Sequence, residues 1–167
     1  MVFADARALM DPVRSSLLAG VAATAVFVVL LAVAGPLTGE SGLFVVETLS
    51  SLCELGGPQY CEPGSATEGA LTVAAFLALF ALAWPLFFAG FTWGLPGSSG
   101  VAHGAVFGAV LWTGYLVTVL YGVGLAGVSL SASLPALAAA LVAYLGYGAV
   151  LGGGYDYLAE HRTLLDE

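Results

Sequence analysis

Long apolar runs almost free of charged residues alternate with short polar segments along this chain. Four of the runs reach about 20 residues, the length that a helix needs to cross the hydrocarbon core of a bilayer. This pattern predicts an all-α integral membrane protein with a single domain, a bundle of four transmembrane helices. We expect the helices at residues 17–37, 69–94, 101–125 and 134–158, with a polar loop at residues 38–68.

The first two runs contain residues that qualify this pattern. Ala32-Val33-Ala34 resembles a signal-peptide cleavage site, but the run is longer than a usual signal core, so we expect an uncleaved helix. Pro85, inside the second run, predicts a kink and a freed carbonyl group that a neighbouring helix or water must satisfy. Residues 1–16 have apolar positions at helical spacing and favour a short surface helix. A frayed tail is the alternative, because Pro12 interrupts the spacing.

The loop at residues 38–68 holds both cysteines of the chain, Cys53 and Cys61, and five of its eleven acidic residues. A Gly-Gly-Pro turn stands between the cysteines, so a hairpin there would bring their α carbons within bridging distance. If the loop faces the cell exterior, the oxidising environment favours a bond between them. The loop therefore predicts a disulfide.

Composition supports the membrane assignment and excludes other classes. Of the 167 residues, 60% are hydrophobic and 8% are charged, against about 25% charged in soluble domains. Three arginines, no lysine and a formal net charge of −8 leave little to neutralise phosphates, so the sequence predicts no nucleic-acid partner. An acidic, lysine-free chain rich in Ala, Gly and Val favours an extremely halophilic archaeal source, because strong salt screens surface carboxylates.

The distribution of basic residues predicts the orientation in the membrane. Four spans place both termini on the same side, and Arg7, Arg14 and Arg162 all lie in the terminal segments. The positive-inside rule then puts both termini in the cytoplasm and the cysteine loop outside the cell. We predict a multi-pass protein of the cell membrane.

Glycines recur at intervals of four in the last two runs. The third run contains Gly100, Gly104 and Gly108, and the fourth contains Gly148 and Gly152. Glycine at this Gly-x-x-x-Gly spacing opens a flat strip on which another helix backbone can approach closely. Because the two helices run in opposite directions, both strips fall in the cytoplasmic half of the membrane. We expect a close antiparallel crossing of the two helices there.

Few residues in the apolar runs can support chemistry. His103 and His161 could ligate haem or a metal, but their different depths favour a polar crevice for the first and solvent for the second. Asp156 lies close to the expected interface, and Thr113 is a polar position within the third run. The tyrosines near Asp156 fit an interfacial aromatic belt; they are Tyr144, Tyr147, Tyr155 and Tyr157. We therefore predict no metal site, no cofactor and no catalytic residue.

The segments GVAHGAVFGAVLW and LGYGAVLGGGYDYL resemble the Gly-rich helices of small polytopic membrane proteins of haloarchaea and other prokaryotes, in families of unknown function. In those families, too, an aromatic residue or a histidine precedes a Gly-x-x-x-Gly step. The resemblance covers about the last seventy residues. It implies a four-helix membrane fold and carries no activity with it.

Packing features are abundant in this sequence and chemical groups are sparse. We therefore expect a non-enzymatic accessory or scaffold subunit of a membrane complex, with a membrane-protein partner or further copies of itself as neighbours in the lipid bilayer. One alternative is an oligomeric channel or permease for a small neutral solute, using the Pro85 kink, His103 and Thr113. Another is a quinone-linked or haem-binding redox subunit, although the single cysteine pair would lack a second station for an electron relay.

Overall fold

The computed structural model describes residues 12–39, 44–49, 62, 64–94, 98–120 and 133–159, and these residues contain helices and no strand. Cys53, Cys61 and His161 lie outside the described residues, as do residues 1–11. The helices in chain order are α1 (Pro12–Thr38), α2 (Phe44–Glu47), α3 (Ala66–Leu77), a π-helical turn (Ala78–Ala83), α4 (Trp84–Phe91), a 3₁₀ turn (Thr92–Gly94), α5 (Gly100–Leu120) and α6 (Leu134–Leu158).

Four of the helical segments are long and apolar enough to cross a membrane, which confirms the predicted all-α, four-helix membrane fold. They are α1, the continuous helix Ala66–Phe91, α5 and α6. The first begins at Pro12, so residues 12–16 extend this helix and do not belong to a separate surface helix. Proline is well suited to the first turn of a helix because its missing N–H would have no partner there. The interruption expected at Pro12 is thus the start of α1.

Local sequence signals begin two of these helices. Ser65 precedes α3, and its hydroxyl accepts a hydrogen bond from the backbone N–H of Glu68 at 3.1 Å. The Glu68 carboxylate in turn accepts one from the N–H of Gly64 at 2.7 Å, close to the reciprocal pattern of a capping box. Ser133 precedes α6 in the same way and accepts from the N–H of Ala136 at 3.3 Å. These bonds satisfy N–H groups that have no partner inside the helix.

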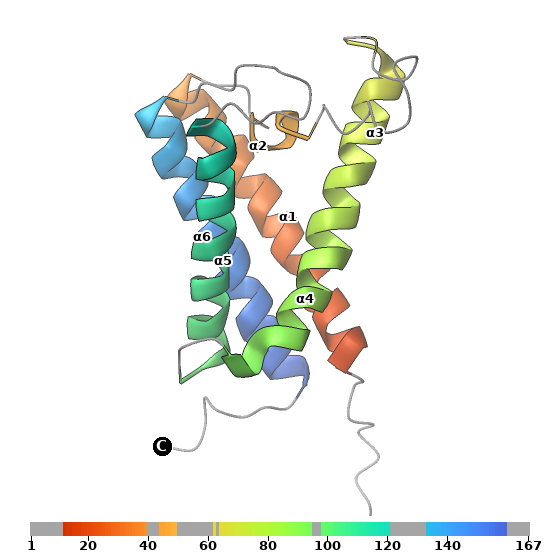
Figure 1. Cartoon of the computed structure of the whole chain (residues 1–167), viewed down its shortest axis with the longest axis vertical. Helices are drawn as coiled ribbons and strands as arrows, with labels where there is room; N and C mark the ends of the chain where they lie inside the picture. The colour runs from red at the N-terminus through yellow and green to blue at the C-terminus, as the bar shows by residue number, and fades with distance from the viewer. Residues whose placement is uncertain are drawn as a thin grey trace, which may run out of the picture.

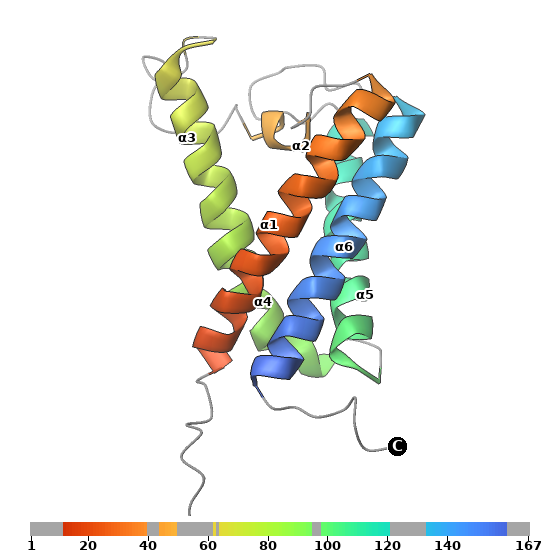
Figure 2. The same cartoon turned by 180° about the vertical axis from the view of Figure 1, so that it is seen from behind.

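The helix α6 lies between α1 and α5 and packs against both along its length (Figures 1 and 2). Helix α1 begins and α6 ends at the same end of the bundle, which is the lower end in both views. The short α2 lies at the opposite, upper end, between α3 and the other helices. Val45 and Val46 of α2 are buried, so this turn is anchored to the bundle by its apolar side chains.

Glycine contacts bring α5 and α6 together in the lower half of the bundle. A methyl group added at Gly104 would overlap the backbone carbonyl of Gly148, and one at Gly148 would overlap the carbonyl of Gly104. Gly152 has the same relation to the carbonyl of Gly100, and Gly108 to that of Tyr144. Above this crossing, the indole N–H of Trp112 donates to the carbonyl of Leu137 at 3.1 Å. Backbone therefore lies directly on backbone at the crossing, and only glycine fits there.

The continuous helix Ala66–Phe91 is attached to the bundle mainly at its lower half. Gly20 of α1 faces Pro85, where a methyl group would overlap the proline ring. On the α5 side, Phe107 contacts the rings of Trp84 and Phe88, with centroid distances of 6.3 and 5.3 Å. From these contacts α3 rises away from α5, and α2 lies between their upper ends (Figure 1). The two helices therefore stand apart at their upper ends.

Candidate functional site

A cavity of about 630 Å³ lies between α3–α4 and α5, beneath α2. Its size falls within the range of about 300–1,000 Å³ that is usual for small-molecule sites. Most of the side chains around it are aliphatic or aromatic, and the polar ones have hydroxyl groups. The lining residues are Val45, Thr48, Leu49, Leu79, Phe80, Trp84, Phe87, Phe107, Val110, Leu111, Gly114, Tyr115, Thr118 and Tyr144.

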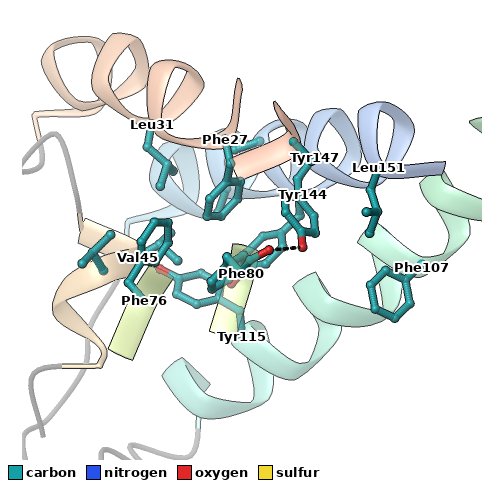
Figure 3. Packing of buried hydrophobic residues seen from close by; sticks show 14 of the residues in the cluster. Phe27, Leu31, Val45, Phe76, Phe80, Phe107, Tyr115, Tyr144, Tyr147 and Leu151 are labelled. Carbon is teal, nitrogen blue, oxygen red and sulfur yellow. Dashed lines mark hydrogen bonds between the residues drawn. The ribbon is translucent and has the colours of Figure 1, made fainter. Parts of the chain in front are cut away.

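The inner wall of the cavity belongs to an aromatic cluster in the centre of the molecule (Figure 3). Phe80 contacts Phe27 at a centroid distance of 4.9 Å and Phe76 at 4.8 Å, with nearly parallel rings. Tyr144 and Tyr147 of α6 pack against the same Phe27 ring, at 4.9 and 5.7 Å. These offset and tilted contacts between large rings fix the position of the cavity wall.

The π-helical turn places Phe80 in this wall. Within the turn, the N–H of Trp84 bonds to the carbonyl of Leu79, five residues earlier. The next bond in this register would join the N–H of residue 85 to the carbonyl of Phe80, but residue 85 is proline and has no N–H. The hydroxyl of Tyr147 donates to the Phe80 carbonyl instead, at 2.7 Å (Figure 3). The carbonyl that Pro85 frees is thus satisfied by α6.

This arrangement corrects the expectation that the tyrosines of α6 form an interfacial belt. Tyr147 is fully buried and Tyr144 is 5% exposed, both in the aromatic cluster. Tyr155 is also buried, whereas Tyr157 is 83% exposed. A hydropathy scale gives tyrosine the same value wherever it occurs in a span. The hydrogen-bond partner of buried Tyr147 comes from another helix, so the sequence of α6 alone does not reveal it.

Asp156 was expected close to the interface, but the structure buries it as well. The residue is 9% exposed, and its carboxylate accepts a hydrogen bond from the N–H of Gly100 at 3.1 Å. Gly100 is the first residue of α5, so the carboxylate lies at the positive end of that helix dipole. Asp156 therefore joins the end of α6 to the start of α5, and it is buried there, not solvated at an interface.

The other predicted polar positions do not converge on one site. His103 is half-buried in the first turn of α5, near the lower end. Thr113 is exposed, and its hydroxyl donates to the carbonyl of Ala109 in its own helix at 2.9 Å. Among the described residues, no group of three or more His, Cys, Asp or Glu side chains could hold a metal ion. The glycines Gly100, Gly104, Gly108, Gly148 and Gly152 all lie in the α5–α6 crossing.

The residues around the cavity were not predicted from the sequence as a site. Pro85 gave one usable signal, because a proline within a span requires a donor from elsewhere. The apolar residues of α2 favour a short helix against the membrane, but they do not predict that it packs over the cavity.

The fold and the cavity define a polytopic membrane protein of four helices with an apolar site inside the bundle. By its sequence, the chain belongs to DUF6789, a family of unknown function whose match covers residues 10–166. No curated protein and no solved structure was found to match it.

Proposed function

We propose that the chain is a non-enzymatic membrane protein, an accessory subunit that holds a lipid-soluble molecule in the cavity between α3–α4 and α5. The cavity is the observation that supports this proposal. Its lining is almost entirely apolar, and apolar walls with a few hydroxyl groups suit a molecule drawn from the hydrocarbon phase. The paucity of acid, base and nucleophile around it supports binding over catalysis.

The size of the cavity supports an occupant. An empty space of about 630 Å³ between packed helices is unfavourable, because it forfeits packing contacts. Ring atoms along the wall would lose their van der Waals partners on one side. An occupant restores those contacts.

The orientation and the source of the chain belong to the same proposal. The arginine distribution supports cytoplasmic termini, and in that orientation α2 and the cavity would lie toward the outer face of the membrane. A disulfide between Cys53 and Cys61 would then form in the external loop that leads from α2 to α3. The acidic, lysine-free composition supports a halophilic archaeal host, so the protein is best purified at high salt.

The experiment is a purification of the full chain from native membranes in mild detergent, followed by extraction and mass spectrometry of bound molecules. The test variant is Gly114→Phe, because Gly114 lines the cavity and a Cβ there meets nothing within 4 Å. Gly69→Phe is the matched control, since its Cβ is equally free and it lies outside the cavity lining. We expect a stoichiometric lipid-soluble molecule in the wild type and the control, and its loss in Gly114→Phe. Equal recovery from all three proteins would contradict the proposal.

A further inference from the structure

Tyr144 has a buried hydroxyl group without a partner in the described part of the chain. The residue lines the cavity and is 5% exposed, yet its hydroxyl makes no hydrogen bond to any described residue. Tyr147, one turn away, donates to the Phe80 carbonyl. A buried hydroxyl that forgoes its hydrogen bond costs about 1–3 kcal/mol. Tyr144 is therefore a donor available to whatever fills the cavity.

Two other hydroxyl groups of the cavity lining are already engaged. Thr48 donates to the carbonyl of Val45 at 2.6 Å, and Thr118 donates to that of Gly114 at 2.9 Å. These are bonds within the local turn and the helix. They leave the threonine methyl groups as apolar surface, and neither threonine hydroxyl is left as a donor for an occupant.

The depth of Tyr144 in the bundle restricts the chemistry of the occupant. Tyr144 is the eleventh of the 25 residues of α6, which places it about 15 Å along the helix from Leu134, at 1.5 Å per residue. Half the thickness of a bilayer's hydrocarbon core is also about 15 Å. Phospholipid headgroups and ester oxygens lie at the interface, so an acyl chain that enters the cavity presents no acceptor to this hydroxyl.

We propose that Tyr144 donates a hydrogen bond to the carbonyl oxygen of a lipid-soluble ketone or quinone that occupies the cavity. This inference rests on the proposed function, since it requires that the cavity holds a ligand. The rings of Phe80, Trp84 and Phe107 supply flat apolar walls for a conjugated carbonyl compound. A side chain longer than the cavity would extend into the surrounding lipid. The proposal is one of binding and includes no electron transfer.

The test uses two probes of nearly equal shape, 2,3-dimethyl-1,4-naphthoquinone and 2,3-dimethylnaphthalene, which differ in the two carbonyl oxygens. Binding of each to the purified full chain in detergent is measured by equilibrium dialysis for the wild type, Tyr144→Phe and Gly114→Phe. Tyr144→Phe removes a hydroxyl that has no hydrogen-bond partner in the described part of the chain, so the melting temperature should stay close to that of the wild type. Tyr147→Phe serves as a control that removes a neighbouring tyrosine hydroxyl already bonded to Phe80.

We expect Tyr144→Phe to bind the quinone about five- to tenfold more weakly, the worth of one hydrogen bond, and to bind the hydrocarbon unchanged. The carbonyl stretching frequency of the bound quinone should be lower in the wild type and in Tyr147→Phe than in Tyr144→Phe. Equal quinone affinity and an equal carbonyl frequency in the wild type and Tyr144→Phe would overturn the role of Tyr144 while leaving the cavity as a binding site. If Gly114→Phe binds both probes as tightly as the wild type does, the proposed function itself is overturned.

Discussion

At the scale of single residues, the glycines of the α5–α6 crossing are the positions at which side-chain size decides whether the molecule folds. Each glycine faces backbone atoms of the opposite helix, and backbone cannot move aside as the end of a flexible side chain can. Glycines elsewhere, such as Gly69 and Gly114, have open space where a Cβ would stand. The same residue type therefore has opposite tolerance at different points of the chain.

We predict that Gly104→Leu destabilises the protein by at least about 3 kcal/mol, because the new side chain forces the two backbones apart. Thermal unfolding in detergent, followed by circular dichroism, measures the effect. Gly69→Leu is the matched control and should change the stability by less than about 0.5 kcal/mol. A Gly104→Leu protein as stable as the control would mean that the helices do not cross at these glycines.

The sequence indicates the crossing because glycine spacing has a direct geometric meaning. It does not indicate where Asp156 or Tyr147 lies, because the burial of a polar side chain depends on a partner from a distant segment. For Asp156 the partner is the N–H of Gly100, 56 residues away, and for Tyr147 it is the carbonyl of Phe80, 67 residues away. When only their position in the fourth apolar run is considered, both residues are assigned to the membrane interface.

At the scale of elements, the long second helix is divided into α3, the π-helical turn and α4, and this division shapes the cavity. Pro85 removes the N–H that would close the turn, and Tyr147 replaces it from α6. The hydropathy of the sequence predicts one uninterrupted span here, because a π turn and an α-helix of the same residues are equally apolar. The hydropathy pattern also does not predict the direction in which α3 leaves the bundle.

We predict that the effect of Tyr147→Phe depends on the residue at position 85. In the wild type, the substitution leaves the Phe80 carbonyl buried without a donor and should cost about 1–3 kcal/mol of unfolding free energy. In a Pro85→Ala background, the restored N–H can bond to that carbonyl, so the same substitution should cost less. A double-mutant cycle of thermal unfolding measures the coupling. Additive effects would show that Tyr147 does not stand in for the missing N–H.

At the scale of the whole molecule, the number of spans follows from apolar length, but their arrangement does not. Each spanning helix is apolar on nearly all sides, so no polar stripe marks which face packs inward. The inward faces are determined by complementary packing between helices, such as the packing of Gly20 against the Pro85 ring. The cavity results from these contacts and from the position of α2, and for that reason it could not be predicted from the run of hydropathy.

The order in which the four helices cross the membrane determines which connecting segments face the same side. Ser98 is exposed and precedes α5 by two residues, and α5 begins at the end of the bundle where α1 begins (Figure 1). Both native cysteines lie between α2 and α3 in the sequence. We predict that a membrane-impermeant maleimide reacts with the reduced native cysteines in intact cells. A Ser98→Cys variant in which Cys53 and Cys61 are replaced by serine should react only after the membrane is opened, because the positive-inside rule places that end of the bundle in the cytoplasm. If the Ser98→Cys variant reacts in intact cells and the native cysteines react only after the membrane is opened, the orientation is inverted and the fold is unchanged. If both sites react from the same side, the order of membrane crossings is wrong, because the helix Ala66–Phe91 separates the two sites.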